Sequence, residues 1–165
     1  MTGLAIQDRL FPDLTCFGCG PANAKGLQLK SYRDGDLVVA SFMPWPEHDN
    51  GIGYLNGGII ATLLDCHSAA AVFETAEDEG WERIGGSAFA FITAGIDVEY
   101  LRPAPLREPV ELRARIVSAS EPEIVCEDEL WWDGKVRSRG TAVWKRWRPR
   151  PGSTEESSHA RSHRL

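Results

Sequence analysis

The sequence predicts an α+β protein in which a strongly curved antiparallel sheet of five to six strands wraps around one long central helix. Three observations predict this arrangement. A long proline-free segment is apolar on most sides, as a buried helix is. Segments before and after it alternate apolar and polar residues, as strands do. Because one helix cannot cover an extended sheet of that size as a separate layer, the economical arrangement is a sheet curved around the helix.

Length and composition bound the class of protein. The chain has 165 residues, 42% of them hydrophobic and 25% charged, which is typical of one globular domain. Its net charge of −6 argues against nucleic-acid binding, which normally requires a basic surface. The apolar runs are too short for a membrane span, and the first residues lack the features of a signal peptide. We therefore expect a cytoplasmic protein that binds neither nucleic acid nor membrane.

The beginning of the chain is predicted to form a segment of turns followed by a hairpin. Residues 1–26 carry turn chemistry and form an N-terminal segment with a Cys-x-x-Cys loop. Residues 27–33 and 37–42 are predicted to be the first two strands. An Asp-Gly turn at 34–35 joins them, because glycine tolerates the positive φ of a tight hairpin. Residues 43–56 are rich in proline and glycine and are predicted to form an irregular loop.

The central helix is predicted over residues 57–76. Within Gly57–Phe73, Asp65 is the one carboxylate. Burying an isolated ionised carboxylate is costly, so such a residue is normally paired, protonated or functional. Two interpretations stay open at this point: a structural aspartate satisfied by backbone groups, or a functional carboxylate beside a cavity. The side chains at helical spacing from it are small: Ala61, Thr62, Ser68 and Ala69.

Further strands are predicted after the helix, and they complete a domain of residues 27–147. Each alternates apolar and polar residues, which predicts a sheet with one buried and one exposed face. A second Asp-Gly turn at 133–134 joins the last two. The strands are expected at residues 94–100, 110–116, 124–132 and 135–147.

The end of the domain is rich in tryptophan, and the chain after it is polar. Aromatic side chains crowd the last two strands, which predicts a homo-oligomer packed through the outer face of the sheet. Residues 148–165 contain two prolines and four serines with no apolar run, so they are expected to be a disordered tail. The crowded aromatic residues are Trp131, Trp132, Trp144 and Trp147.

The four cysteines are expected to be thiols in a reducing compartment. Cys16 and Cys19 form a Cys-x-x-Cys pair in a loop rich in glycine and proline. A zinc ribbon needs a second such pair, which the sequence lacks, and a thioredoxin-type site needs the pair at a helix start. We therefore interpret them as structural loop cysteines, with metal or redox chemistry as the less favoured alternative. No metal site and no cofactor are expected.

The start of the helix adds a second chemical feature. Gly57 and Gly58 allow another molecule to approach the backbone closely, and the first amides of a helix lack intrahelical partners. Such an amide can polarise a carbonyl and stabilise an oxyanion. Asp65 is eight residues further on, about 12 Å of helical rise. The carboxylate and the amide of one helix therefore cannot meet, unless a second subunit supplies one of them or the substrate is extended.

At these residues the sequence resembles a known family. The segment Leu55–Asp65 resembles the His-Gly-Gly-(six residues)-Asp motif of hotdog-fold acyl-CoA thioesterases, the group that contains 4-hydroxybenzoyl-CoA and phenylacetyl-CoA thioesterases. Residues 16–20, with Asn23 and Gly26-Leu27, are similar to the N-terminal motif of one branch of the family. Residues 93–105 are similar to the strand after the helix. The resemblance covers residues 16 to about 147 and implies the hotdog fold.

The resemblance also implies roles and an assembly. Asp65 would activate water as a general base or attack as a nucleophile, and Gly57, with Gly58, would hold the thioester oxygen. Thr93 matches a strand hydroxyl that assists the carboxylate. In the family these groups come from opposite subunits, which implies a homodimer here, with a dimer of dimers as the alternative. The substrate implied is an acyl-CoA.

One residue departs from the family motif. Asn56 stands where the family usually has histidine, and an amide cannot take a proton near neutral pH. This leaves a second function open: a non-catalytic acyl-CoA or acyl-ligand binding protein on the same fold. A hydratase ranks last, because no well-spaced pair of aspartate and histidine is present. His48 and His67 are interpreted as loop and core histidines.

Substrate-binding residues are expected among apolar residues near the helix start and among arginines. Ligand pockets are mostly apolar, and the phosphates of CoA require cationic donors at the rim. Arg102 is the arginine assigned to CoA, with Arg113, Arg137 and Arg139 as further candidates. The candidates for the acyl pocket are Trp45, Tyr54, Leu55, Phe89 and Phe91.

Overall fold

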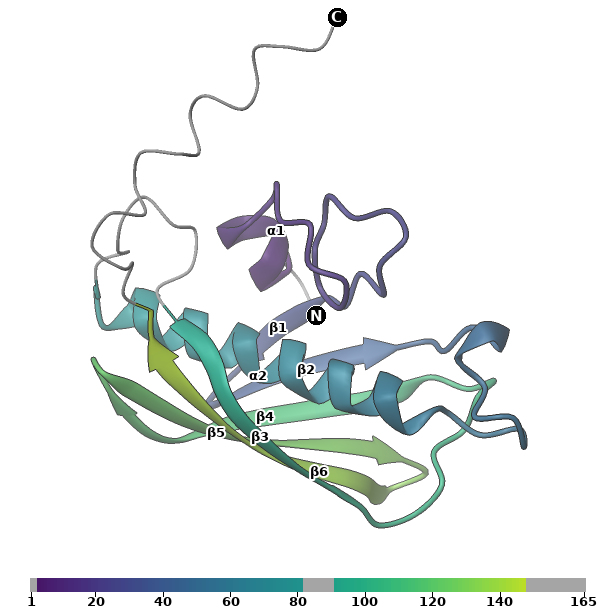
Figure 1. Cartoon of the computed structure of the whole chain (residues 1–165). Coiled ribbons are helices and arrows are strands. Elements are labelled where there is room, and N and C mark those ends of the chain that lie inside the picture. Colours follow the sequence, from purple (N-terminus) through teal and green to yellow (C-terminus); the bar gives the residue numbers. More distant parts are fainter. Residues whose placement is uncertain (1–2, 82–90, 148–165) are drawn as a thin grey trace, which may run out of the picture.

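The structure, a computed structural model of the chain, describes residues 3–81 and 91–147. A short N-terminal helix precedes a hairpin, a long helix and four further strands (Figure 1). The elements are α1 (Ile6–Leu10), β1 (Ser31–Asp34), β2 (Leu37–Phe42), the 3₁₀ turn η1 (Pro46–His48), α2 (Gly57–Asp78), β3 (Phe91–Tyr100), β4 (Val110–Ser120), β5 (Glu123–Trp132) and β6 (Lys135–Arg146).

The six strands form one antiparallel sheet in the order β1-β2-β4-β5-β6-β3. The sheet curves, and α2 lies along its inner face (Figure 1). The helix spans 22 residues and ends two residues beyond the predicted end. The predicted fold class, a curved antiparallel sheet around one long central helix, is therefore confirmed.

Both Asp-Gly turns form where the sequence predicts them. Gly35 has a φ of 61° between β1 and β2, and Gly134 has a φ of 65° between β5 and β6. Asp133 also takes a positive φ, 50°, which aspartate tolerates better than most residues. Trp132 and Lys135 pair directly across this second turn, so the dipeptide sets the register of the hairpin.

The N-terminal segment is more regular than predicted, and the first strand is shorter. The helix α1 was not predicted, because its five residues carry too little periodicity to reveal a helix. β1 begins at Ser31, not at residue 27. The Leu27 amide donates to the Phe17 carbonyl (2.8 Å) and the Leu29 amide to the Gly18 carbonyl (3.0 Å). This stretch therefore lies along the cysteine loop and not in the sheet.

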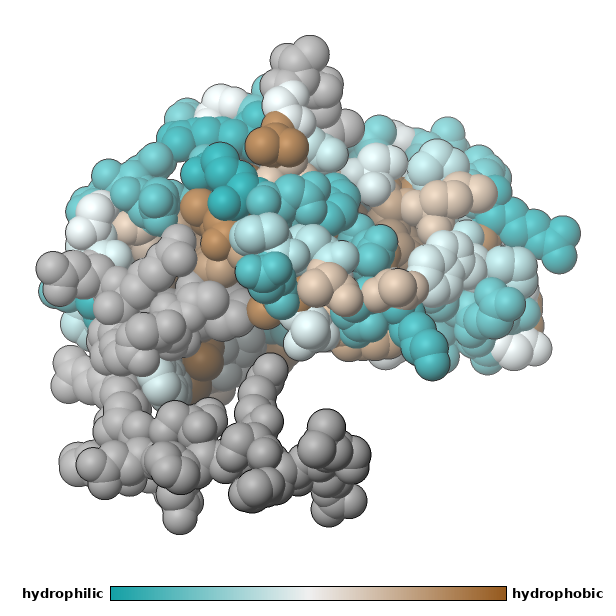
Figure 2. All heavy atoms as spheres, turned by 90° about the horizontal axis from the view of Figure 1, so that it is seen from above, coloured by the Kyte–Doolittle hydropathy of each residue, from teal (hydrophilic) through white to brown (hydrophobic). Residues whose placement is uncertain are grey.

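The helix α2 is apolar all round because it is covered on two sides. The sheet covers one side, and α1 with the cysteine loop covers the other (Figure 1). The rings of Phe11 and Phe73 meet there at 5.0 Å. The helix α2 is long and apolar enough to cross a membrane, but most of it is buried inside the fold, as in many core helices. Seen from the side of α1, hydrophobic residues form separate patches among hydrophilic ones (Figure 2).

The strand β3 departs from the predicted pattern of one buried and one exposed face. Phe91 is buried, whereas Ile92, Ile96 and Tyr100 are 49%, 37% and 53% exposed. The reason is its position, because β3 is an edge strand that pairs with β6 alone. A long apolar edge strand offers unpaired backbone groups to another strand.

Three of the four tryptophans that suggested an oligomer have partners within the chain. Trp144 is buried, and its Nε1 donates to the Ser68 hydroxyl (3.2 Å). The guanidinium groups of Arg113 and Arg137 lie 4.5 Å and 4.4 Å from the ring centroids of Trp131 and Trp132. Contacts within the chain therefore account for the placement of these three tryptophans. The tail predicted at 148–165 lies outside the described residues.

Candidate active site

Asp65 and Thr93 meet where α2 passes the start of β3. The Thr93 hydroxyl donates a hydrogen bond to Asp65 Oδ1 at 2.8 Å. The Asp65 side chain is half-buried, and this burial raises the pKa of its carboxyl. The bond from Thr93 lowers the pKa in part, and the neighbouring Cys16 raises it. The result is an oriented carboxylate that keeps contact with solvent.

The start of α2 forms a second polar group of residues. Asn56 is the N-cap, and its Oδ1 accepts from the amides of Gly58 (2.8 Å) and Ile59 (3.4 Å). The Gly58 amide, one of the two predicted oxyanion donors, is therefore already occupied. The Gly57 amide has no acceptor among the described residues, as expected at the first position of a helix. The Tyr100 hydroxyl donates to the Gly57 carbonyl (2.8 Å) and so ties β3 to this end of the helix.

The cap also determines how the Asn56 amide is oriented. Two backbone N–H groups require an oxygen acceptor, so Oδ1 faces the helix and the NH₂ group is left over. Within the described ranges, that NH₂ group has no partner. Asn56 therefore adds a donor beside the Gly57 amide. It cannot act as an acid or base there.

A single chain holds these groups as two separate half-sites. Asp65 with Thr93 is one half, and Asn56, Gly57 and Tyr100 are the other. Eight residues of helix, about 12 Å of rise, lie between them. One carbonyl carbon cannot contact both halves of the same chain.

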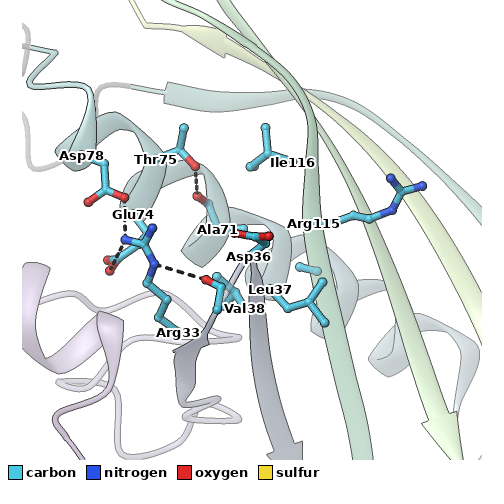
Figure 3. A pocket seen from close by; sticks show the side chains of 12 residues that line it. Arg33, Asp36, Leu37, Val38, Ala71, Glu74, Thr75, Asp78, Arg115 and Ile116 are labelled. Atoms are coloured by element: carbon cyan, nitrogen blue, oxygen red, sulfur yellow. Dashed lines mark hydrogen bonds and ion pairs between the residues drawn. The ribbon is translucent and has the colours of Figure 1, made fainter.

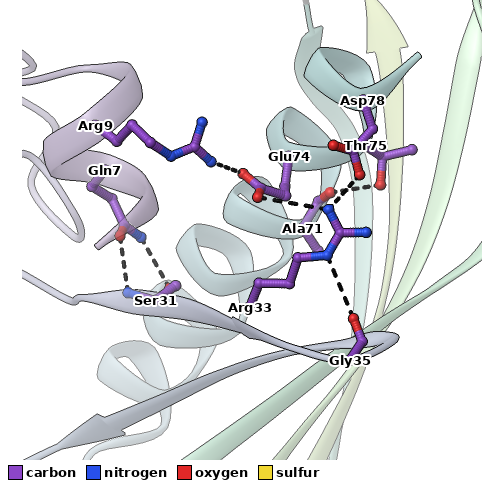
Figure 4. A network of polar contacts seen from close by, with 9 residues as sticks. All are labelled: Gln7, Arg9, Ser31, Arg33, Gly35, Ala71, Glu74, Thr75 and Asp78. Carbon is purple, nitrogen blue, oxygen red and sulfur yellow. Dashed lines mark hydrogen bonds and ion pairs between the residues drawn. The ribbon is translucent and has the colours of Figure 1, made fainter. Parts of the chain in front are cut away.

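His67 is a core residue with all its hydrogen-bonding capacity used. Its Nε2 faces the Val38 carbonyl (3.0 Å), so Nε2 carries the proton and Nδ1 accepts from the Ser31 hydroxyl (2.9 Å). Gln7 bonds both the hydroxyl and the amide of Ser31 (Figure 4). Complete burial lowers the pKa of His67 to about 4. The histidine is therefore neutral and locks β1 and β2 to α2.

His48 has a structural role in the loop before α2. Its ring stacks on Trp45 at 4.7 Å and on Phe42 at 5.7 Å, and its Nδ1 accepts from the Trp45 amide (3.1 Å). Burial lowers the pKa of His48. Its carbonyl also accepts from the Asn56 amide at 2.8 Å. The histidine thus holds the N-cap residue of α2 through its backbone carbonyl. Trp45, which stacks on its ring, remains 42% exposed.

The predicted substrate-binding residues fall into exposed and buried groups. Tyr54 is 44% exposed and lines a cavity of about 400 Å³ together with Pro103, Leu106 and Trp132, among others. Leu55 and Phe91 are buried in the core at 3% and 1% exposure.

Of two further predicted binding residues, one is within the described part of the chain and one is not. Arg102 is exposed, and its guanidinium donates to the Val136 carbonyl (3.1 Å), which places it beside the turn of the β5–β6 hairpin. Phe89 lies outside the described residues.

Another pocket, of about 180 Å³, lies at the C-terminal end of α2 (Figure 3). Three of its charged side chains, those of Arg33, Glu74 and Asp78, are joined by ion pairs. Arg33 contacts Asp78 at 2.5 Å and Glu74 at 3.9 Å, and Arg9 also bonds Glu74 (Figure 4). Because these ion pairs are at the surface, they contribute little to stability.

The structure reveals one cluster that the sequence analysis did not foresee. Cys66, on α2, lies beside the loop pair Cys16 and Cys19, and all three are free thiols. The sequence shows the pair but gives no sign that a cysteine fifty residues later reaches it. The one feature of the sequence that could have drawn attention to Cys66 is its position directly after Asp65.

Comparison with known proteins matches the chain to one family. A family model described as the thioesterase superfamily matches residues 52–136, which contain the start of α2 and Asp65. The crystal structure of a thioesterase superfamily protein from Shewanella loihica is 30% identical. The match covers 78% of this chain and 98% of that chain, with a TM-score of 0.61. The comparison with curated proteins returns no match.

Two more distant structures share the fold. A phenylacetic acid degradation-related protein from Ralstonia eutropha is 21% identical, covering 86% of this chain and 98% of that chain at a TM-score of 0.64. A Streptococcus mutans protein bound to acetyl CoA is 16% identical, covering 72% of this chain and 88% of that chain at a TM-score of 0.60.

Proposed function

The chain belongs to the thioesterase superfamily, and from this premise we propose that it hydrolyses an acyl-CoA thioester to a free acid and coenzyme A. The observation that carries the proposal is the half-buried Asp65 carboxylate held by the Thr93 hydroxyl. An oriented carboxylate with raised pKa is suited to taking a proton from water. The acetyl CoA bound to the Streptococcus mutans structure is consistent with a CoA thioester as ligand on this fold.

Asp65 has one oxygen free for the reaction. Thr93 occupies Oδ1, so Oδ2 faces the water that attacks the thioester carbon. Asp65 takes a proton from that water as the new carbon–oxygen bond forms. The tetrahedral intermediate then expels the CoA thiolate, which receives the proton. In the alternative path Asp65 attacks the carbon directly, forms a mixed anhydride, and water hydrolyses that anhydride.

The carbonyl oxygen would bind at the start of α2. Its developing negative charge is stabilised by the unpaired Gly57 amide and by the positive end of the helix dipole. The NH₂ group of Asn56 adds a second donor. This arrangement assigns Asn56 to binding and needs no imidazole at that position.

A homodimer would bring the two half-sites together, and the edge strand β3 supports it. Thr93 is near one end of β3 beside Asp65, and Tyr100 is at the other end beside Gly57. If two copies of β3 pair antiparallel about the point between Ile96 and Asp97, Thr93 of one subunit lies opposite Tyr100 of the other. Each Asp65 would then face Gly57 of the partner subunit.

Turnover of acyl-CoAs tests the proposal. A panel of aliphatic and aromatic acyl-CoAs is assayed by release of free thiol, with wild type beside Asp65→Asn. We expect wild-type turnover of at least one acyl-CoA and a loss of about 10³-fold or more in the variant. Near-full activity of Asp65→Asn would contradict the assignment. Oxygen-18 in the enzyme carboxylate after a single turnover in labelled water would indicate the anhydride path.

A second function, non-catalytic binding of an acyl-CoA or a related acyl ligand, is favoured by Asn56 alone. This residue caps the helix and cannot transfer a proton. Calorimetry with the same panel separates the two functions. Tight binding without hydrolysis by the wild type would support the binding protein, and absence of binding would remove it.

A further inference from the structure

Three thiols from distant parts of the chain converge beside the proposed active site. Cys16 and Cys19 come from the loop before β1, and Cys66 comes from the middle of α2. The three sulfur atoms all lie within 4.8 Å of one another, and Cys16 Sγ is 3.7 Å from Cys66 Sγ. Cys19 and Cys66 are buried, whereas Cys16 is half-buried.

The backbone of the loop is shaped to bring its sulfurs to the helix. The Gly20 amide donates to the Cys16 carbonyl (3.0 Å) and closes a tight turn around the pair. A Cβ at Gly18 would lie 2.3 Å from Cys66 Sγ, so only glycine lets the loop lie this close to α2. A Cβ at Gly20 would lie 2.4 Å from the Cys16 nitrogen.

The loop is also held firmly from outside the turn. Backbone bonds from Leu27 and Leu29 attach the segment before β1 to the loop. The sulfur positions are therefore determined by backbone packing and not by flexible side chains. A binding site organised in this way loses little conformational entropy when it takes a ligand.

The chemistry of the cluster is that of a soft donor set. The polar groups directed at Cys16 Sγ are the thiols of Cys19 and Cys66 and the amides of Gly18 and Cys19. Thiols are weak hydrogen-bond donors and acceptors, so a thiol triad offers little stability of its own. Three sulfurs at this spacing, two of them from a Cys-x-x-Cys turn, suit Zn²⁺ and related thiophilic ions.

We propose that Cys16, Cys19 and Cys66 together bind one thiophilic metal ion, for which Zn²⁺ is the probe. Three thiols would bind as thiolates and release three protons, leaving the fourth position of a tetrahedral ion to water. The ion would attach the N-terminal segment to α2 one residue from Asp65. A metal site was not predicted because the sequence lacks the second Cys-x-x-Cys pair of a zinc ribbon. The helix cysteine supplies the third ligand instead.

Metal binding by the reduced full-length protein tests the proposal independently of any catalytic activity. The protein is reduced, stripped of metal and titrated with Zn²⁺ against a chromophoric chelator. Co²⁺ is used in parallel, because thiolate ligation produces a sulfur-to-metal charge-transfer band. We expect about one ion per chain, and a drop of at least about 100-fold in Zn²⁺ affinity for both Cys16→Ser and Cys66→Ser, since even supporting residues of metal sites are worth 10–100-fold.

Cys126 provides the matched control. It is a fully buried thiol in the core, outside the cluster. Cys126→Ala is expected to bind Zn²⁺ as the wild type does. Cys16→Ser replaces one half-exposed atom, and its circular dichroism should match the wild type, so this variant carries the test even if Cys66→Ser fails to fold.

Two results would overturn the proposal. One is a reduced wild type that binds Zn²⁺ no more tightly than Cys16→Ser, or a Co²⁺ spectrum without the sulfur band. The other is a disulfide between two of the three cysteines in the purified protein, detected by alkylation and mass spectrometry, with no metal bound after its reduction. In that case the cluster is a redox pair with a neighbouring thiol.

Discussion

Asp65 and Asp128 are two aspartates with a raised pKa and very different surroundings. Burial is the largest cause of the rise at both. Asp65 is half-buried on α2 and accepts a hydrogen bond from Thr93. Asp128, on β5, is 2% exposed, and in the described part of the chain neither of its carboxyl oxygens has a hydrogen bond of good geometry. The nearby backbone amides of Glu129 and Arg113 offset only part of the rise in its pKa.

The contrast shows that a raised pKa reports burial and does not identify an active site. Asp128 pairs with Ala114 on one side and Gly140 on the other, facing the core, where neither water nor substrate reaches it. Asp65 keeps one oxygen oriented by a donor and one available. The two carboxyl groups therefore differ in their access to solvent and in the hydrogen bond that orients Asp65. Desolvation is common to both.

The strongest effect is expected when each aspartate is replaced by asparagine and turnover is compared. Asp65→Asn should lose about 10³-fold or more in kcat/KM, about 4 kcal/mol, because the base or nucleophile is gone. Asp128→Asn should keep turnover within about three-fold, since it contacts no substrate. The assay is thiol release from the best acyl-CoA, and a large loss in Asp128→Asn with an intact fold would refute the contrast.

Thr93 is expected to have the next largest effect. Thr93→Ala should lower kcat by about 10- to 100-fold, because the carboxylate loses its orienting donor, while KM changes little. Thr93→Ser keeps the hydroxyl and should restore most of the rate. A role in strand packing alone predicts the reverse pattern, in which both variants lose thermal stability and neither loses rate per folded molecule.

Asp128 should make the free energy of unfolding depend on pH in an unusual direction. Its folded-state pKa lies above the unfolded value, so its contribution is full below about pH 4 and is lost as pH rises toward the folded pKa. Asp128→Asn should therefore be more stable than wild type at neutral pH, by about 1–3 kcal/mol, and the difference should shrink on acidification. Urea unfolding at several pH values measures it, and a difference independent of pH would contradict the prediction.

Asn56 should show the smallest change, with the opposite sign. Its Oδ1 accepts hydrogen bonds from two backbone amides, so Asn56→Ala should destabilise the protein by about 1 kcal/mol through loss of the cap. Asn56→Ser keeps a capping oxygen and should retain most of that stability. Thermal melts of the wild type, Asn56→Ala and Asn56→Ser measure the contribution of the cap to stability. Equal stability of Asn56→Ala and wild type would show that the cap contributes nothing.

The fold was predictable because it depends on local patterns. The Asp-Gly turns, the alternation in β4, β5 and β6 and the apolar run of α2 are all set by near neighbours in the chain. The misassigned elements are those whose state depends on distant contacts. The segment before Ser31 looks like a strand by composition, but its amides pair with the cysteine loop. β3 alternates like a half-buried strand, but its place at the sheet edge leaves it exposed.

The candidate site divides in the same way. Sequence was enough to single out Asp65 and the glycines at the helix start, because each is unusual within its own segment, whereas the hydroxyl of Thr93 was indicated only by the resemblance to the family. Contacts between segments could not be derived from it: Thr93 reaches Asp65 across 28 residues, and Cys16 reaches Cys66 across 50. Backbone periodicity extends over a few residues, whereas these meetings depend on how the sheet curves and how the N-terminal loop packs on α2. The sequence therefore indicated the candidate groups for the chemistry, and the packing of distant segments decided which of them lie together.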